Sequence, residues 1–282
     1  MVFRTKKQKS DLRLNNVIPP PTGGGIFHLA EISLQYRYMP TKTNHRPFRL
    51  ILVRHGESQS NIYQAMIDKG EVFGYPPEFA KVRDWDINLT KKGKAQALKT
   101  GKFLKKEFGT FHACYVSPFN RTRQTFEEIL RGYADPKAKK EMLAHTRYDS
   151  RLREKDHGAI NFLSRAEVKR HYPHEFERRE REGKFLYRPL GGESWYDVKD
   201  LRVGGILNTI YRDHRGESVL VIAHSIVLKC FRMKLERMNE VEYEKVADKT
   251  HLDNCGVSLY EYTERAPGHG KLMLKYWNKT AY

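Results

Sequence analysis

Cysteine and long apolar runs are scarce in this chain, and acidic residues are outnumbered by basic ones. Its three cysteines, Cys114, Cys230 and Cys255, are widely spaced and form no CxxC pair, which argues against a disulfide framework and a zinc site. No apolar run is long enough to cross a bilayer, and no apolar segment follows Met1, so neither a transmembrane helix nor a secretory signal is predicted. We therefore expect an intracellular, cytoplasmic protein whose cysteines are reduced and buried.

An excess of basic over acidic residues gives the chain a strong positive charge. There are 34 Asp and Glu residues against 52 Lys and Arg residues, a net charge of +18. Such an excess favours polyanionic partners, which include nucleic acid, an acidic membrane surface and phosphorylated small molecules. Solubility alone is an equally good explanation, because net charge carries no information about the fold.

The first part of the chain has the composition of an extension. Residues 1–49 hold nine Lys and Arg residues and two Asp and Glu residues, and three consecutive prolines and three consecutive glycines lie at 19–25. Such a segment cannot bury a core, so we predict a basic, partly disordered N-terminal extension over 1–45 and a folded domain over 46–282. Alternation between Ile26 and Met39 predicts either an additional edge strand or a segment that packs on the domain. RNA or another polyanion is a possible partner of this basic arm, and its few acidic residues also resemble a mitochondrial or other organellar targeting segment.

The stretch from Leu50 to Asn61 combines a buried strand with a reactive turn. Four apolar residues end at Arg54 and His55, and Gly56 then permits a sharp turn before a predicted helix. Backbone N–H groups at a helix start favour anions, a guanidinium matches phosphate oxygens, and an imidazole is a nucleophile. The pattern predicts an anion site, although a lone histidine more often has a structural role.

Similar junctions between a strand and a helix recur later in the chain. A strand over His112–Val116 precedes a helix over Arg121–Leu130, and the apolar strand Ser218–Ala223 runs into His224 before a helix expected over Val227–Val246. In open α/β sheets ligands bind at the carboxyl ends of the strands. We therefore expect these junctions to meet in one crevice.

Several other elements complete the predicted alternation. They are a helix capped by Thr90, a charged and salt-bridged helix over Arg165–Glu182, a helix from Gly191–Ser194 to about Tyr211, and a late strand over Gly256–Tyr262.

Six motifs follow one another along the chain: Arg54-His55-Gly56-Glu57-Ser58 with Asn61, Asp86 to Gly93, Ser117-Pro118 with Arg121 and Gln124-Thr125, Leu152 to Gly158, Gly192-Glu193-Ser194, and Val221 to His224. In combination, these motifs resemble the histidine phosphatase superfamily, the group of phosphoglycerate mutase-like and acid-phosphatase-like enzymes. The motifs cover most of residues 49–262. The resemblance implies an α/β fold, a three-layer α/β/α sandwich with a mostly parallel central sheet.

The resemblance also implies a role for each matching residue. His55 would be the nucleophile that accepts the phosphoryl group, and Glu154 the proton donor to the leaving oxygen. Arg54, Asn61, Arg121 and His224 would bind the phosphate, with His224 also counted as catalytic. No metal ion and no cofactor is expected, because two arginines and a histidine supply the positive field. One departure from the family pattern is Ser225, which stands where a glycine is usual and adds a side chain expected to lie beside the phosphate pocket.

Hydrolysis of a phosphomonoester is the reaction that we predict. Two alternatives stay open at this point. The Arg178-Arg179 pair is compatible with phosphotransfer of the phosphoglycerate mutase type, and the basic arm is compatible with a subunit or adaptor of a nucleic-acid-rich assembly. The sequence identifies neither the substrate nor the oligomeric state.

Overall fold

The computed structural model describes residues 45–246, 251–264 and 270–282, and within these ranges a six-stranded sheet organises the chain. The strands are β1 (Arg49–Arg54), β2 (Ala113–Val116), β3 (Thr146–Tyr148), β4 (Ser218–Ala223), β5 (Val257–Glu264) and β6 (Gly270–Lys279). The helices are α2 (Gln59–Asp68), α3 (Lys91–Phe108), α4 (Asn120–Gly132), α5 (Pro136–Ala144), α6 (Arg165–His171), α7 (Pro173–Leu186), α8 (Gly204–Asp213), α9 (Ser225–Glu236) and α10 (Glu240–Glu244). The strand expected over Ile26–Met39 lies outside the described residues, as does the predicted extension up to residue 44.

The strands lie in the order β3-β2-β4-β1-β5-β6. The first four are parallel, and β5 and β6 add an antiparallel hairpin to one edge. Arg54 lies opposite Ala223 and Val116 lies opposite Ile222, so β1, β2 and β4 end at the same level. This register brings the three predicted junctions to one edge of the sheet, as expected for a parallel α/β fold.

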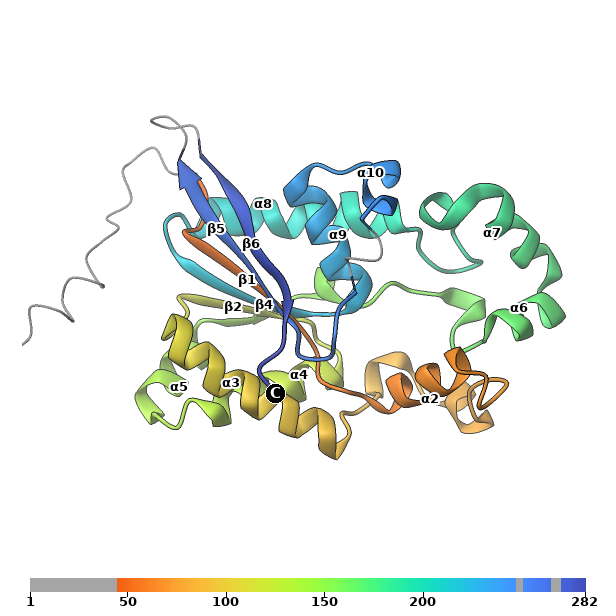
Figure 1. Ribbon diagram of the computed structural model, residues 1–282, viewed down its shortest axis with the longest axis horizontal. Coiled ribbons are helices and arrows are strands. Elements are labelled where there is room, and N and C mark those ends of the chain that lie inside the picture. Colours follow the sequence, from red (N-terminus) through yellow and green to blue (C-terminus); the bar gives the residue numbers. More distant parts are fainter. Residues whose placement is uncertain (1–44, 247–250, 265–269) are drawn as a thin grey trace, which may run out of the picture. The chain divides into compact units, whose positions relative to one another are not determined.

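Alternating side chains of the strands build a core on each face of the sheet. Leu50 and Leu52 of β1 belong to a cluster with residues of α8 and α9, whereas Ile51 and Val53 pack with residues of α3, α4 and α5. Successive side chains of a strand point to opposite faces, so a strand that is apolar throughout needs helices on both sides. The predicted three-layer α/β/α sandwich is confirmed, and its layers are visible in Figure 1.

Capping side chains fix where two of the helices begin. Ser58 is the N-cap of α2, and the Asn61 side chain accepts from the Ser58 backbone N–H in return. At α3 the Thr90 hydroxyl accepts from the N–H of Gly93 at 3.0 Å, as predicted. Both caps place a helix start directly beside the turn that follows β1.

Two helices predicted as continuous are interrupted. The stretch Arg165–Glu182 is divided between α6 and α7, because Pro173 has no N–H to continue the first helix. The helix expected over Val227–Val246 ends at Glu236, where Arg237 adopts a left-handed conformation with φ 57°, and only α10 follows. The helix expected from Gly191–Ser194 begins as a π-helical segment, Asp197–Val203, before α8.

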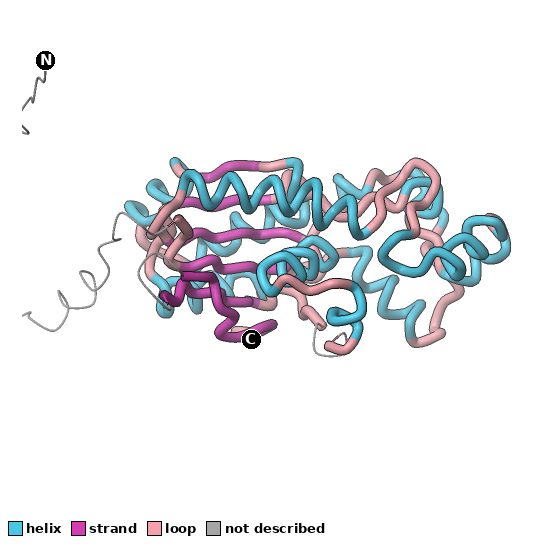
Figure 2. Tube along the Cα trace, turned by 90° about the horizontal axis from the view of Figure 1, so that it is seen from above, coloured by secondary structure: helices cyan, strands magenta, loops and turns pink. Residues whose placement is uncertain are grey.

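Several elements were not predicted from the sequence, and one of them, β6, is a strand of ten residues. They are α5, β3 and β6, together with one-turn 3₁₀ helices at Pro77–Lys81 (η1), Asp84–Asp86 (η2), Ser150–Leu152 (η3) and Gly158–Ile160 (η4). Figures 1 and 2 show α2, α6 and α7 beyond one end of the strands, which is the end where β1 and β4 run into their helices. These segments surround the predicted site.

The described residues contain neither a membrane-spanning helix nor a cluster of metal-binding side chains. None of their helices combines the length and the apolar character that a membrane span needs. Nor do three or more of their His, Cys, Asp or Glu side chains gather in an arrangement suited to a metal ion.

Candidate active site

The predicted phosphate-binding residues converge at the carboxyl ends of β1, β2 and β4. Arg54 and His55 end β1, Arg121 lies in the first turn of α4 after β2, and His224 follows β4. The rings of His55 and His224 are 5.1 Å apart between centroids. Four residues that span 170 positions of sequence, from 54 to 224, thus meet in one place.

The His55 ring is held in one tautomer. Its Nδ1 lies 2.8 Å from the carbonyl oxygen of Gly56. A carbonyl only accepts, so Nδ1 carries the proton and Nε2 keeps its lone pair. Burial, followed by the charges of Arg121 and Arg54, holds the pKa of His55 well below its ordinary value. The imidazole is therefore neutral at physiological pH, which is the form that acts as a nucleophile.

Arg54 enters the site with part of its guanidinium uncommitted. Its Nη1 donates to the carbonyl oxygen of Leu252, in the segment that precedes β5. Its Nε is buried and has no hydrogen-bond partner in the described part of the chain. An unpaired buried donor is costly, and an anion bound beside it would satisfy it.

Arg121 is held by an acidic residue that the sequence did not single out. Asp84 of η2 accepts from Nη1 at 2.8 Å and from Nη2 at 3.2 Å, and the Asp84 backbone oxygen accepts from Nη1 at 2.6 Å. The guanidinium also lies 5.0 Å from the centroid of the Phe119 ring. These contacts fix a buried cation beside His55.

His224 lies behind His55 and is fully buried. Its Nε2 is 2.8 Å from the hydroxyl of Ser117, and its ring packs against Phe119. Its Nδ1 is buried and has no hydrogen-bond partner within the described ranges. Burial and the nearby Arg121 hold the pKa of His224 well below the usual value, so this ring is also neutral. Its predicted contact with phosphate stays a prediction.

Asn61 is oriented by three hydrogen bonds to its side-chain oxygen. Oδ1 accepts from the Ser58 backbone N–H at 3.1 Å, from the Ser58 hydroxyl at 3.0 Å and from the Asn254 amide at 2.9 Å. Since these bonds occupy the acceptor, the NH₂ group is the part of the amide available to a ligand. An NH₂ group donates hydrogen bonds, and an anion accepts them.

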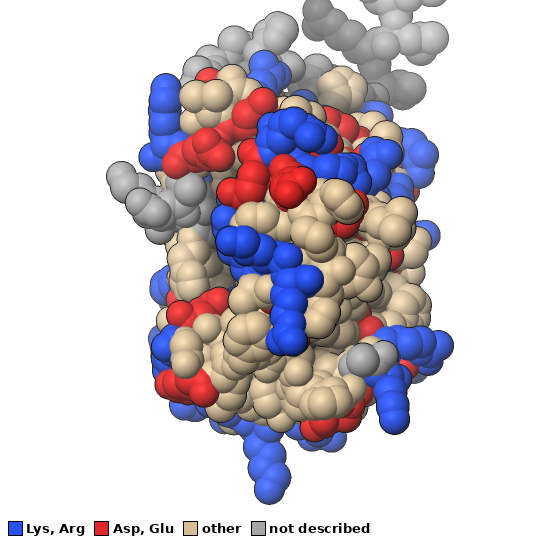
Figure 3. All heavy atoms as spheres, turned by 90° about the vertical axis from the view of Figure 1, so that its right-hand side faces the viewer, with Lys and Arg blue, Asp and Glu red and all other residues tan. Residues whose placement is uncertain are grey.

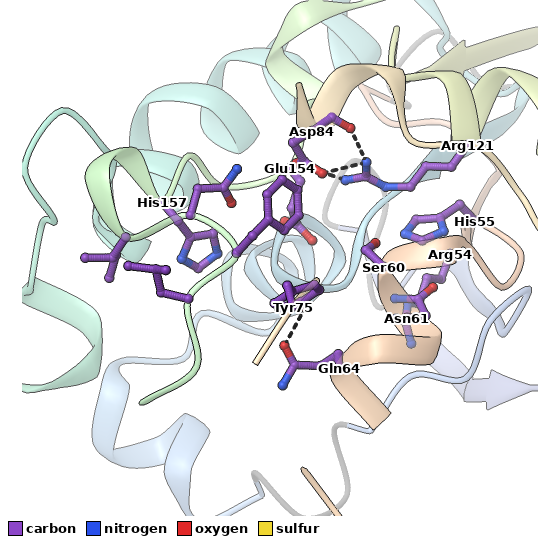
Figure 4. Close-up of a pocket in the computed structure, with 14 residues that line it drawn as sticks. Arg54, His55, Ser60, Asn61, Gln64, Tyr75, Asp84, Arg121, Glu154 and His157 are labelled. Atoms are coloured by element: carbon purple, nitrogen blue, oxygen red, sulfur yellow. Dashed lines mark hydrogen bonds and ion pairs between the residues drawn. The ribbon is translucent and has the colours of Figure 1, made fainter. Parts of the chain in front are cut away.

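Glu154 lies across the cavity from His55, on the loop after η3 (Figure 4). The loop is held in place by Arg202, whose Nη1 donates to the carbonyl of Arg153 at 2.6 Å. One carboxylate oxygen of Glu154 accepts from the Lys155 N–H at 2.9 Å. Burial raises the pKa of Glu154 above its ordinary value, which favours the protonated form.

These side chains border a cavity of about 210 Å³. Its lining includes five of the six predicted site residues, all except the buried His224. The further residues that line it are Ser60, Gln64, Tyr75, Asp84, His157, Ile160, Asn161, Phe162 and Leu163.

The sequence analysis did not predict these nine lining residues. Helical spacing could have predicted Ser60 and Gln64 as site residues, because they share a face of α2 with Asn61. The others lie in loops and short helices without a recognisable motif.

Two residues that the sequence analysis placed near the site, Ser225 and Arg178, do not line the cavity. Ser225, expected beside the phosphate pocket, is the first residue of α9 and is not among the residues that line the cavity. Arg178, half of the pair compatible with a mutase, is bound by Glu175 at 2.7 Å and Glu182 at 3.2 Å on α7. Its neighbour Arg179 is exposed and lies close enough to His157 to contribute to that residue's lowered pKa.

Comparison with known families agrees with this geometry. The sequence model of the histidine phosphatase superfamily (branch 1) matches residues 50–273. The chain belongs to this superfamily. The match spans the sheet from β1 into β6, and it includes every residue placed at the site above.

Similar proteins differ in the activities that their names state. A phosphoglycerate mutase-like protein of Arabidopsis thaliana is 31% identical over 235 residues, 76% of this chain and 74% of that protein. The 2,3-bisphosphoglycerate-dependent phosphoglycerate mutase of Bartonella bacilliformis is 29% identical over 199 residues, 68% of this chain and 84% of the enzyme. A solved structure of a mycobacterial glucosyl-3-phosphoglycerate phosphatase has a TM-score of 0.58 and 19% identity, covering 82% of this chain and 99% of that one. At this identity the likeness shows the fold alone.

Proposed function

We propose that this chain is a phosphatase that hydrolyses a phosphomonoester through a phosphohistidine at His55. The observation that carries the proposal is the state of His55, a neutral imidazole whose Nε2 lone pair is free while Nδ1 is bound to the Gly56 carbonyl. The guanidinium groups of Arg54 and Arg121 flank it. Phosphoryl transfer needs an in-line nucleophile and positive donors around the equatorial oxygens, and this arrangement offers both.

In the first step, Nε2 of His55 attacks phosphorus while the bond from phosphorus to the ester oxygen breaks. Glu154 gives its proton to the departing oxygen, so the alcohol leaves neutral. The raised pKa of Glu154 supports this role, because a general acid must still hold its proton near the working pH. The product of the step is phosphohistidine with an ionised Glu154.

In the second step, water replaces the alcohol. The Glu154 carboxylate takes a proton from the water as the water oxygen attacks phosphorus, and the P–N bond breaks. His55 returns with its lone pair on Nε2, and inorganic phosphate is released. Arg54, Arg121 and the Asn61 amide would hold the three equatorial oxygens in both steps.

The cations of the cavity favour a substrate with one phosphate group over a bisphosphate. Arg54 and Arg121 are its only Lys or Arg residues among those the structure describes, and both lie on the His55 side. In transfer of the mutase type, the site must bind a second anionic group of the substrate. The intermediate must then reorient so that this second group faces His55. The exposed Arg179 near His157 is the one feature that favours such transfer. Stimulation by 2,3-bisphosphoglycerate would identify a mutase, and indifference a phosphatase.

The test is to trap the covalent intermediate. The protein is mixed with a ³²P-labelled phosphomonoester and quenched in alkali, where phosphohistidine survives. Wild type and the exposed-surface control His174→Ala should both retain label, and His55→Ala should retain none and lose turnover. Since His55 is a polar side chain at a turn, its removal should leave the circular dichroism spectrum unchanged. Wild-type activity in pure, folded His55→Ala would refute the proposal.

A further inference from the structure

A second and larger cavity adjoins the phosphate cavity. Its volume is about 640 Å³, and it shares Asn161, Phe162 and Leu163 with the first. Its other walls come from the end of η1, from η4 and from the junction of α6 and α7. Residues 161–163 thus lie between the phosphate cavity and the second cavity.

Six of the nine residues that line the second cavity have apolar or aromatic side chains: Phe79, Val82, Ala159, Phe162, Leu163 and Tyr172. The lining also has polar atoms, among them those of Asn161 and His171, but no Lys, Arg, Asp or Glu among the described residues. His171 is its one imidazole. Figure 3 shows this end of the molecule, where uncharged side chains cover much of the lower half of the face. Val82 and Tyr172 are exposed. Apolar surface held open beside a site is typical of ligand binding.

Phe162 forms the boundary between the two cavities. Its ring packs edge-on against Phe79 at 5.5 Å and against Tyr75 at 5.3 Å between centroids. Tyr63 extends this aromatic group by packing against Phe79 at 5.1 Å. Phe162 also has φ 56°, a left-handed conformation that non-glycine residues rarely adopt. Packing against the neighbouring rings holds it there, which is a common finding where a residue shapes a binding site.

We infer that the second cavity binds the alcohol part of the substrate, and that this alcohol carries an uncharged aromatic or extended apolar group. The inference rests on the proposed function, since it supposes that a phosphomonoester occupies the first cavity. The position of the group is argued from residues 161–163, which line both cavities and so make the second one the neighbour of the phosphate site. The group should be uncharged because the described lining has no charged side chain. A carboxylate or second phosphate would lose water there without gaining a partner of opposite charge.

The test uses phosphate esters of primary alcohols with similar leaving groups. These are ethyl phosphate, 2-phenylethyl phosphate and the phosphate ester of 3-hydroxypropanoate. Burial of a phenyl group should make kcat/KM for the phenylethyl ester at least about tenfold higher than for the ethyl ester, and the carboxylate ester should be no better than the ethyl ester. Equal values for the ethyl and phenylethyl esters would overturn the inference.

A charge placed in the cavity wall should reverse the preference. Val82→Lys is chosen because Val82 is exposed and lies outside the proposed catalytic set, so the variant should fold. It should lower kcat/KM for the phenylethyl ester by about threefold or more and raise it for the carboxylate ester, with ethyl phosphate changed by less than about twofold. The control is Val241→Lys, another exposed valine, on α10. Equal effects of the two variants would contradict the assignment of the cavity.

Binding of non-hydrolysable phosphonates separates failure of this inference from failure of the proposed function. Ethylphosphonate and 3-phenylpropylphosphonate are titrated into the wild-type protein by calorimetry. Tighter binding of the phenyl compound without hydrolysis of any ester would refute the phosphatase and keep the cavity assignment. Hydrolysis of ethyl phosphate with equal phosphonate affinities would keep the phosphatase and refute the assignment.

Discussion

The carboxylate of Asp84 binds the guanidinium of Arg121, 2.8 Å from Nη1, within the cavity that borders His55. A phosphate held by Arg121 would therefore lie near the negative charge of Asp84, which lines the same cavity. The pair fixes the arginine geometrically and weakens the positive field that the arginine presents to an anion.

Asp84→Asn should tighten the binding of inorganic phosphate. The amide keeps a hydrogen-bond acceptor for Arg121 and removes the repulsive charge, so the inhibition constant of phosphate should fall by about three- to tenfold. Asp86→Asn is the matched control, because Asp86 is two residues away and pairs with the exposed Arg83 at 2.7 Å. Weaker phosphate inhibition in Asp84→Asn would mean that the carboxylate acts mainly by holding Arg121 in position.

Glu154→Gln should slow hydrolysis of alkyl phosphates far more than that of 4-nitrophenyl phosphate. An alkoxide needs a proton to leave and a nitrophenolate does not, and general acid catalysis is worth about 10²- to 10⁴-fold. Glu177→Gln, on the exposed face of α7, is the control. The same rate loss for both ester types would assign the proton donor to another group.

The same carboxyl group should govern the alkaline limb of the pH profile. Burial raises the pKa of Glu154, and only its protonated form donates, so kcat for an alkyl phosphate should fall as pH rises through that pKa. The limb should be absent in Glu154→Gln. A limb that persists unchanged in the variant would show that a different group titrates.

Stability should fall in mildly acidic solution because of buried neutral histidines. Burial and the charge of Lys155 lower the pKa of His157 to about 4. Between its unfolded value near 6.5 and pH 4 the unfolded chain binds the extra proton, so the free energy of unfolding decreases as pH falls, by up to about 1.4 kcal/mol per pH unit. His55 and His224 act in the same direction.

Urea unfolding at pH 7.5 and pH 5 measures this effect. His157→Gln should lose less stability between the two values than the wild type does. His174→Gln, whose side chain is 94% exposed, should behave like the wild type. An equal loss in His157→Gln would mean that His157 is not held neutral.

Gly93→Ala should disrupt the site from a position that no substrate touches. A Cβ at Gly93 would lie 2.1 Å from the backbone oxygen of Glu57, so the turn after His55 or the start of α3 must move. We expect Gly93→Ala to lower the free energy of unfolding by about 2 kcal/mol or more. The variant should also lose most of its activity. At Gly205 the nearest atoms are 3.7 Å away, and Gly205→Ala in α8 should be neutral or stabilising by up to about 1 kcal/mol. Full activity of Gly93→Ala would contradict this account.

Arg54, His55, Arg121 and His224 could be predicted from the strands that they end or follow, whereas Asn61 and Glu154 were predicted only from the resemblance to the superfamily's motifs. Arg54 ends the apolar strand β1, and His224 directly follows the apolar strand β4. Strand periodicity and the parallel topology were therefore enough to predict that the two residues lie close together. Asp84, Tyr75 and Phe162 could not be predicted, because they lie in short helices and loops whose positions depend on packing between segments distant in sequence. Proline and left-handed residues explain the helix breaks, but a single residue such as Arg237 gives no sign in sequence that it will adopt φ 57°.

The segment before β5 has a consequence for how the protein is made. Leu252, Asn254 and Cys255 all hydrogen-bond to Arg54 or His55, across about 200 positions of sequence. The phenol of Tyr282 donates to the carbonyl of Asn254 in turn. A nascent chain that has released β1, β2 and β4 therefore still lacks the contacts that hold Arg54 and His55 in place. These contacts form only after the hairpin of β5 and β6 has been synthesised and β5 pairs with β1.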